Sequence, residues 1–442
     1  MRDKEYHRPS SSPPRTYIKR VGEFSSPLAM RSAVVIALLG LAALASASEY
    51  HRYKVVSVVP RTAEDATVVR RAVDALNLDQ WTDPRAPGVP VDIMVPPRLA
   101  QGFLNGLKIR GIPFSIKIDD VQALIDEQMA TQRSADPHPR QFDHTSYQTL
   151  DQIYSILDAV ESDFGEMVST YTAGTSYEGR PIRVAKISSG NGGTKEVVWI
   201  DCGIHAREWI APATCQWIMD KLTSGYGSDS EVTELLDAYD FHILPSVNPD
   251  GYTFTHTSER LWRKNRVPYG SLGCHGTDPN RNFDSDFGGP GTSNSPCSDI
   301  YHGPSAFSEA ESQAVRDSVL ALAPQMKVFF TIHSYSQLWM TPYGYTSSLP
   351  ANYDDQYRVS GVGVSALTAV HGTRFEYGNI ADTIYPAAGG SSDWAYDTAG
   401  VQMAFALELR DTGNYGFLLP ADQIIPVGEE TWAGIVAAIK AI

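Results

Sequence analysis

The chain has 442 residues, and its 51 acidic against 36 basic side chains give a formal net charge of -15 at pH 7. This length allows a large hydrophobic core and more than one domain, since one domain takes roughly 100 to 200 residues. The acidic balance argues against a nucleic-acid-binding protein, which would need a basic face.

The first 47 residues predict an extension followed by a secretion signal. Residues 1–29 are polar, basic and rich in Pro and Ser, a composition typical of disorder. Residues 30–47 begin with Met30 and Arg31, continue as a short apolar stretch and end in Ala-Ser-Ala. Because this stretch is shorter than the roughly 18 residues of a membrane span, we interpret it as a signal peptide and expect translation to start at Met30 rather than Met1. An uncleaved type II membrane anchor is the alternative.

Residues 48–140 predict a small domain of their own. Apolar and β-branched runs predict strands at 53–59, 89–95 and 112–118, and apolar residues at helical spacing predict a helix in each interval between them. A further helix is expected after Asp119. The pattern is a βαβαβ unit.

A polar stretch broken by proline, residues 132–141, follows this unit and contains Arg133 and Arg140. Exposed linkers of this kind are preferred sites of proteolysis. Because it lies after a secretion signal and before a second, larger domain, we interpret residues 48–140 as a removable inhibitory propeptide. An ordinary interdomain hinge is the alternative.

From residue 141 to 442 helical and strand patterns alternate, which predicts an α/β sheet covered by helices on both faces. Strands are expected at 196–201, 241–245, 327–332 and 401–409, and amphipathic helices at 308–323 and 431–442. The side chains capable of chemistry fall at or just beyond strand ends: His205, Glu208, Asn248, His333 and Glu408. Ligand sites of open α/β sheets lie at the carboxyl edge of the strands, so one cleft can gather these residues.

His205 and Glu208 are the centre of this prediction. They follow the apolar strand and Gly203, three positions apart, where a tight turn lets both side chains reach one cation. A neutral imidazole and a carboxylate suit a catalytic zinc, which takes two or three protein ligands and keeps one position open.

His333 ends an apolar strand and would supply the third ligand, although a hydrogen-bonded structural histidine is the alternative. A second His-x-x-Glu pattern, His256 with Glu259, occurs later in the chain. We interpret that pair as solvated loop residues, because isolated acidic and histidine side chains are usually at the surface.

Glu408 lies near the end of another apolar strand, where a carboxylate is costly unless it is paired or functional. Its functional interpretation is a general base for a water activated by the metal. An ion pair with Arg410 is the alternative.

Cationic residues form a third group: Arg207, the run 260–266 and the segment 278–282. Most charge runs are solvated faces. Here an anion site is the competing interpretation, since arginine binds carboxylates bidentately and stabilises an oxyanion near a scissile carbonyl.

The four cysteines predict two disulfides if the protein is secreted. Three pairings are open, of which the near neighbours suggest Cys202 with Cys215 and Cys274 with Cys297. A cysteine zinc site is disfavoured because no pair has the short C-x-x-C spacing.

Seven motifs, in consistent order over roughly residues 142–442, resemble the zinc metallocarboxypeptidases of the pancreatic A/B type. They are His205-Ala-Arg-Glu-Trp, Asn248-Pro-Asp-Gly-Tyr, Arg260-Leu-Trp-Arg-Lys, Asn280-Arg-Asn, His333-Ser-Tyr-Ser, Ile384-Tyr-Pro-Ala-Ala-Gly-Gly-Ser-Ser-Asp-Trp and Glu408-Leu-Arg-Asp-Thr-Gly. The preceding unit resembles the family's activation domain more loosely. The resemblance implies a mixed eight-stranded sheet sandwiched by helices, preceded by a small α+β activation domain. It also implies removal of single C-terminal amino acids.

The same resemblance implies one zinc per chain, held by His205, Glu208 and His333. Glu408 would be the general base and acid, and Arg263 would polarise the scissile carbonyl. Asp278 falls where the family has a carboxylate that orients the first zinc histidine.

Asn280, Arg281 and a mobile Tyr385 would hold the substrate's terminal carboxylate, which makes such an enzyme an exopeptidase because an internal peptide bond cannot fill that clamp. Arg207 and Tyr335 would line the next subsite. The resemblance matches Cys274 and Cys297 to the family's common disulfide, and Cys202 with Cys215 to a bridge of B-type members.

Side-chain specificity is expected to be A-like. By resemblance the pocket is lined by Met340, Gly344, Ile380, Ile384, Ser392 and Ala406. B-type enzymes, which take Lys and Arg, have an acid at the position of Ser392, and an unpaired ammonium here would be unfavourable by several kcal/mol. We therefore expect apolar or aromatic C-terminal residues, unless Asp382 turns inward.

Three alternatives remain beside this expectation. They are a B-like enzyme for Lys or Arg, a zinc amide hydrolase for small acylated amino acids, and a catalytically silent zinc-fold binding protein. The complete set of expected catalytic residues argues against the silent protein. The expected partners are peptide C-termini and an activating trypsin-like protease, and the mature protein is expected to be a secreted monomer without nucleic acid or membrane.

Overall fold

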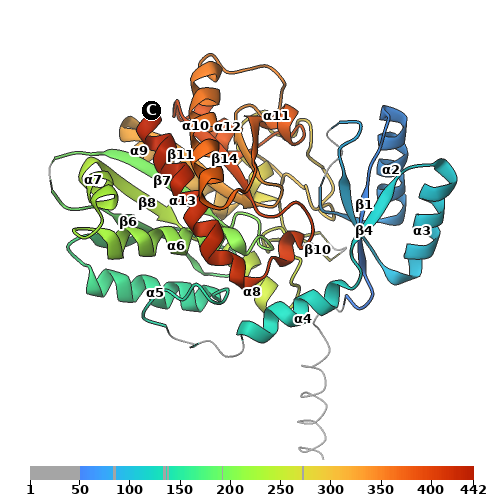
Figure 1. Cartoon of the computed structure of the whole chain (residues 1–442), viewed down its shortest axis with the longest axis horizontal. Coiled ribbons are helices and arrows are strands. Elements are labelled where there is room, and N and C mark those ends of the chain that lie inside the picture. Colours follow the sequence, from blue (N-terminus) through green and yellow to red (C-terminus); the bar gives the residue numbers. More distant parts are fainter. Residues whose placement is uncertain (1–49, 83–85, 133–135, 137–138, 192, 271–272) are drawn as a thin grey trace, which may run out of the picture. The chain divides into compact units, whose positions relative to one another are not determined.

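The structure, a computed structural model, describes residues 50–442 except 83–85, 133–135, 137–138, 192 and 271–272 (Figure 1). The expected N-terminal extension and signal peptide, and Arg133, lie outside the described residues. None of the helices in the described part of the chain has the length and apolarity needed to span a membrane.

The N-terminal α+β unit contains β1 (Lys54–Val58), α2 (Ala63–Leu76), β2 (Asp79–Gln80), β3 (Val91–Val95), α3 (Pro97–Arg110), β4 (Phe114–Ile118) and α4 (Val121–Gln132). Its sheet has the order β2-β3-β1-β4, and all pairs are antiparallel. The predicted strands and helices therefore occur in the predicted order, and the structure adds the short β2.

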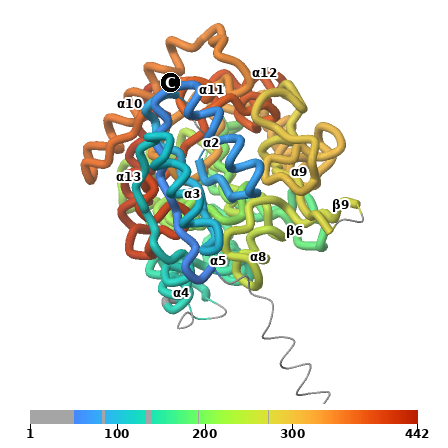
Figure 2. Tube along the Cα trace, turned by 90° about the vertical axis from the view of Figure 1, so that its right-hand side faces the viewer, coloured from blue at the N-terminus to red at the C-terminus, as the bar shows by residue number. Residues whose placement is uncertain are grey.

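Alternation along β1 separates the two faces of this small sheet. Val56 and Val58 pack with α2 and α3, which lie side by side (Figure 2). Val55 points to the opposite face, where it belongs to a cluster that includes Tyr335 and Phe417 from the later part of the chain. The outer face of the sheet is thus closed by its own helices, and the inner face is closed by the second domain.

The second domain is built on a mixed eight-stranded sheet with the order β13-β12-β14-β11-β7-β8-β6-β5, as expected. The strands are β5 (Val168–Thr175), β6 (Pro181–Ile187), β7 (Glu196–Cys202), β8 (Tyr239–Leu244), β11 (Met326–Ser334), β12 (Leu338–Thr341), β13 (Glu376–Asn379) and β14 (Ala404–Leu409). The four central strands β14, β11, β7 and β8 are parallel, so their carboxyl ends share one edge.

Helices cover both faces of this sheet. The principal ones are α5 (Leu150–Asp163), α6 (Ile210–Gly225), α7 (Ser230–Ala238), α8 (Pro249–Thr257), α9 (Ala310–Leu322), α10 (Tyr353–His371), α12 (Ser391–Asp397) and α13 (Ile424–Ala441). Residues of α5, α6, α10 and α13 share one core cluster, and residues of α9 and α12 share the other.

Successive side chains along each central strand point to opposite faces of the sheet, and this alternation decides which of them can reach the site. Phe330, Ile332, Leu407 and Cys202 point into the larger core cluster. The intervening residues of β7, β11 and β14 therefore point to the opposite face, and they include Asp201, Thr331, His333, Ala406 and Glu408. The polar residues among them therefore share one face near the common carboxyl edge.

Candidate functional site

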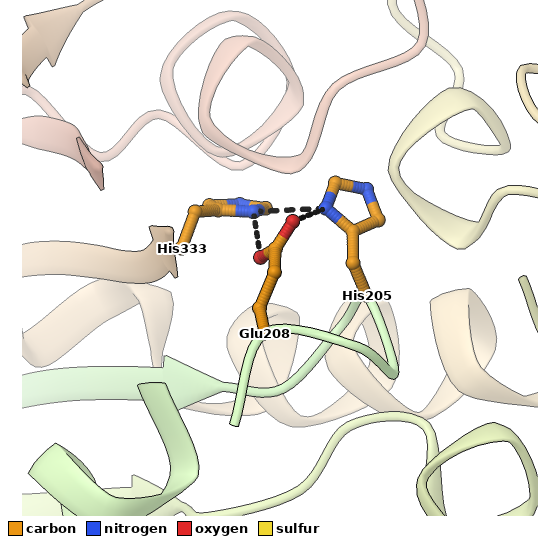
Figure 3. A group of neighbouring side chains, drawn as sticks. All are labelled: His205, Glu208 and His333. Atoms are coloured by element: carbon orange, nitrogen blue, oxygen red, sulfur yellow. Dashed lines mark hydrogen bonds and ion pairs between the residues drawn. The ribbon is translucent and has the colours of Figure 1, made fainter. Parts of the chain in front are cut away.

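His205, Glu208 and His333 form a buried group whose ligand atoms all lie within 4.8 Å of one another (Figure 3). His205 and Glu208 come from the turn between β7 and α6, and His333 comes from β11. Glu208 Oε1 lies 2.7 Å from His205 Nδ1, and Glu208 Oε2 lies 3.2 Å from His333 Nδ1. The predicted turn and strand therefore bring the three side chains together.

The two histidines face each other through atoms that suit a shared cation. His205 Nδ1 and His333 Nδ1 are 3.2 Å apart. Two nitrogens bound tetrahedrally to one zinc at about 2.0–2.1 Å would be separated by roughly 3.3 Å. Glu208 is ionised at neutral pH, because its pKa is lowered by the neighbouring histidines, mainly His205, against the effect of burial. The donor set and its spacing fit a zinc ion.

Asp278 supports the first histidine. Its Oδ1 lies 3.1 Å from His205 Nε2, so the Nε2 proton can be donated to the carboxylate while Nδ1 keeps its lone pair for a metal. Its Oδ2 accepts from Arg263 Nη2 at 2.8 Å and Nε at 3.1 Å. Although burial opposes it, Arg263, His205 and Arg281 together hold the pKa of Asp278 well below its usual range.

Glu408 is next to His333 across the β11–β14 ladder, where the two residues are direct partners. Its Oε2 is buried and has no hydrogen-bond partner among the described residues. Burial, and then the charge of Glu208, raises the pKa of Glu408 well above its usual range. The alternative ion pair with Arg410 is not formed, because Arg410 binds Glu430 on α13, with Nε to Oε1 at 2.8 Å.

A small cavity opens next to the metal group. It is lined by His205, Asn280, Arg281, His333, Met340, Ile380, Ile384, Tyr385, Ala387, Gly390, Ser392, Asp393, Ala406 and Glu408. All the residues expected in the carboxylate clamp, and all but one of those expected in the side-chain pocket, therefore face one space. The exception, Gly344, contacts its wall, since its backbone N–H donates to the lining residue Asp393.

Two acidic residues near this cavity have different positions. Asp382 is exposed and accepts a hydrogen bond from Ser347 at 2.6 Å, so it does not turn into the pocket. Asp393, which the sequence analysis did not single out beyond its motif, is buried in the cavity wall. Its Oδ2 accepts from the backbone of Gly344 at 2.7 Å and of Tyr345 at 3.3 Å, and burial raises its pKa to about 7. Asp393 directly follows Ser392, a residue expected in the pocket, and this position in the sequence could have indicated that Asp393 also lines it.

Arg207 and Tyr335 contact the N-terminal unit. Arg207 Nη1 donates to both carboxylate oxygens of Asp79, and Tyr335 Oη donates to Asp92 Oδ2 at 2.9 Å. Trp81 packs between them against the rings of Tyr335 and Phe417, at centroid distances of 6.4 and 5.0 Å. The N-terminal unit thus covers the two residues expected to line the subsite beside the metal group.

Both disulfides suggested by the near-neighbour pairing are present, Cys202–Cys215 and Cys274–Cys297. The first joins the end of β7 to α6, the two elements that flank the His205 turn. It therefore anchors the segment that carries two of the three candidate ligands.

The interpretation of His256 and Glu259 as solvated loop residues is wrong for His256. His256 lies on α8 and stacks on Trp209 with a ring centroid distance of 4.0 Å. Burial lowers its pKa to about 3, so it remains neutral. Glu259 accepts a hydrogen bond from Tyr50. His256 thus packs on the residue that precedes α6, and it is not among the residues that line the cavity beside the metal group.

Comparisons with known proteins match two parts of the chain to known families. The zinc carboxypeptidase family matches residues 153–434, and the carboxypeptidase activation peptide family matches residues 56–128. Carboxypeptidase A2 of Rattus norvegicus is 43% identical over 386 residues, which cover 86% of this chain and 92% of that protein. Carboxypeptidase B of Astacus astacus is 51% identical over 294 residues, which cover 66% of this chain and 96% of that protein.

Solved structures are also similar. The structure of thrombin activatable fibrinolysis inhibitor has a TM-score of 0.82 at 34% identity, covering 88% of this chain and 98% of that one. The carboxypeptidase A of Helicoverpa armigera has a TM-score of 0.81 at 29% identity, covering 89% and 98%.

Proposed function

Since the chain belongs to the zinc carboxypeptidase family and carries that family's activation peptide, we propose that it releases single apolar or aromatic residues from peptide C-termini. The class is established by its relatives: a metallocarboxypeptidase zymogen that uses one catalytic zinc. The proposal concerns the residue roles and the substrate. The single observation that carries it is the cavity that gathers the metal group, Glu408 and the clamp residues.

We assign the zinc to His205, Glu208 and His333. A zinc ion held there would polarise the scissile carbonyl and increase the acidity of the attacking water. Glu408 would accept the proton of that water and return it to the leaving amine, for which its unpartnered, buried Oε2 is suited. Arg263, whose Nη1 lies 3.9 Å from Glu208 Oε1, would stabilise the negative charge that develops on the carbonyl oxygen.

The clamp for the terminal carboxylate would consist of Asn280, Arg281 and Tyr385. Arg281 is fixed by donating to the backbone oxygens of Gly291 and Asn280, each at 2.9 Å. Tyr385 lies over it, with the guanidinium carbon 6.0 Å from the ring centroid. The carboxylate neighbour of Arg281, Asp278, lies 3.9 Å from Nη1 and is shared with Arg263. A substrate lacking a terminal carboxylate would therefore leave this buried cation incompletely compensated, which favours exopeptidase activity.

The pocket beside the clamp supports an A-like preference. Met340, Ile380, Ile384 and Ala406 make its wall apolar, and Ser392 stands where an acid would be needed for a Lys or Arg substrate. Asp393 Oδ2 is already engaged by two backbone amides. A B-like preference is the second candidate, and the 51% identity to a carboxypeptidase B favours it.

We further propose the domain boundaries and processing. Residues 1–29 would form an extension, 30–47 a signal peptide, 48–140 the propeptide and 141–442 the secreted catalytic domain. In the zymogen the contacts of Asp79, Trp81 and Asp92 would block the substrate's approach. A trypsin-like protease would release the block by cutting at Arg133 or Arg140, and the mature enzyme would act as a monomer.

The test compares blocked dipeptides that end in Phe or Lys, before and after limited trypsin treatment. Cleavage of the Phe substrate that appears only after trypsin supports the A-like zymogen. Preferential cleavage of the Lys substrate would reject the specificity and favour the B-like enzyme. Absence of cleavage with zinc bound would favour a silent binding protein.

A further inference from the structure

Asp201, Thr331 and His333 form a polar line on the active-site face of the sheet, behind the metal group. Thr331 and His333 are two positions apart on β11, so their side chains point to the same face. Thr331 is the direct partner of Asp201 across the β11–β7 ladder. All three side chains are buried, with exposed fractions of 1% for Asp201, 1% for Thr331 and 3% for His333.

The hydrogen bonds along this line can all be donated in one direction, away from the metal group. His333 Nδ1 faces His205 and Glu208, and His333 Nε2 lies 3.3 Å from Thr331 Oγ1. If Nδ1 offers its lone pair to a metal, the neutral ring must carry its proton on Nε2, which can then only donate. Thr331 Oγ1 would accept this bond and donate its own proton onward.

Asp201 is placed to receive that proton. The Thr331 side chain is its neighbour across the ladder, and Trp199 Nε1 donates to Oδ2 at 2.7 Å. Oδ1 is buried without a hydrogen-bond partner among the described residues, which leaves it as the acceptor for the Thr331 hydroxyl. Burying a carboxylate is unfavourable unless hydrogen-bond donors stabilise it. The position of Asp201 beside Thr331 is therefore best explained by a function as hydrogen-bond acceptor.

We infer that Thr331 and Asp201 are positioning residues, which hold the His333 ring through an ordered Nε2–H to Oγ1–H to carboxylate relay so that Nδ1 points at the metal. His205 has a direct counterpart in Asp278. The two histidines would then both be supported by carboxylates, one directly and one through a hydroxyl. Outer partners of metal-bound histidines typically contribute about 10–100-fold in metal affinity.

This inference rests on the proposed function through one assignment, that His333 is a zinc ligand. The test measures the zinc dissociation constant of the full zymogen by competition with a chelator, without substrate. The variants are Thr331→Val, Thr331→Ser, Asp201→Asn and the double variant Thr331→Val with Asp201→Asn. Thr341→Val on β12 is the control, because Thr341 is equally buried and its hydroxyl bonds the backbone oxygen of Pro342.

We expect Thr331→Val to weaken zinc binding at least about 10-fold and Thr331→Ser to restore it, because serine keeps the hydroxyl. Asp201→Asn should weaken it less, and the double variant should be no weaker than Thr331→Val, because the relay is already broken. Unchanged affinity in Thr331→Val, or an equal loss in Thr341→Val, would overturn the inference. If Thr331→Val does not fold, as judged by circular dichroism, unchanged affinity in Asp201→Asn would overturn it.

The His333→Ala variant distinguishes failure of the zinc-ligand assignment from failure of the relay alone. If this variant keeps the affinity of the wild type, the ligand assignment fails and the inference fails with it. If it loses zinc while the Thr331 and Asp201 variants do not, the proposed function stands and the relay alone is rejected.

Discussion

Arg207 Nη1 donates to both carboxylate oxygens of Asp79, at 3.3 and 3.2 Å, and this ion pair joins the activation unit to the rim of the catalytic site. Arg207 is almost fully buried and also contacts the Phe417 ring, with 4.2 Å between the guanidinium carbon and the ring centroid. The same residue would bind substrate in the mature enzyme. In the zymogen, Asp79 therefore supplies the carboxylate that pairs with Arg207.

Replacing Asp79 by Asn should increase activity before trypsin treatment. Loss of one member of a largely buried charge pair weakens an interface by roughly 2 kcal/mol or more, so the activation unit should uncover the site more often. The measurement is hydrolysis of the blocked Phe dipeptide by the intact zymogen. Asp74→Asn, at an exposed position of α2, is the control and should stay latent. An Asp79→Asn zymogen as latent as the wild type would contradict the blocking role.

Replacing Glu408 by Gln should lower kcat of the trypsin-activated enzyme by about 10²–10⁴-fold, since an amide cannot accept the water's proton. The zinc content should not change, because Glu408 is outside the proposed ligand set. Steady-state kinetics and metal analysis together check both statements. Glu429→Gln is the control and should retain full activity, because Glu429 is a half-exposed residue of α13 that contacts His371 and does not line the cavity. Retention of kcat in Glu408→Gln would remove it from the mechanism.

Replacing Ser392 by Asp should move the specificity toward basic residues. A carboxylate in the apolar pocket would pair with a Lys ammonium and leave a Phe substrate facing an unpaired charge. We expect kcat/KM for the Lys dipeptide to rise and that for the Phe dipeptide to fall, each by about 10-fold or more. Asp382→Asn is the matched control, because Asp382 is exposed and bound to Ser347. An unchanged ratio would show that Ser392 does not set the preference.

Glu311 predicts a pH-dependent stability. It is fully buried on α9, where Asn265 donates to its Oε2 at 2.9 Å, and burial raises its pKa from 4.5 to about 7. The pKa of Glu311 is higher in the folded than in the unfolded state. The contribution of its protonated side chain to the free energy of unfolding is therefore present in full below about pH 4.5. That contribution is lost as the pH rises toward 7, by an amount on the order of 3 kcal/mol.

Glu311→Gln should therefore gain stability relative to the wild type between pH 4.5 and 7, and the difference should level off above about pH 7. Urea denaturation across this range measures it. Glu166→Gln, at an exposed site, should follow the wild-type curve. A difference between Glu311→Gln and the wild type that does not vary with pH would contradict the assignment.

Local patterns in the sequence were enough to predict the elements that carry the site. The apolar runs of β7, β11 and β14 predicted strands, and this placed His333 and Glu408 at strand ends. The structure then showed that both lie on the face opposite the larger core. The turn after Gly203 likewise predicted that His205 and Glu208 converge. These relationships join residues that are close in the chain, and the order of the motifs along the chain identified the correct family.

The partners of these residues depended on tertiary structure. Arg410 is two positions from Glu408 but pairs with Glu430, and His256 stacks on Trp209 instead of facing solvent. Thr331 meets Asp201 only because β11 pairs with β7 in one register. The sequence by itself thus determined which side chains stand at strand ends and which chemistry they offer. Only the folded chain decided which of them touch, because strand order and register are set by packing between distant segments.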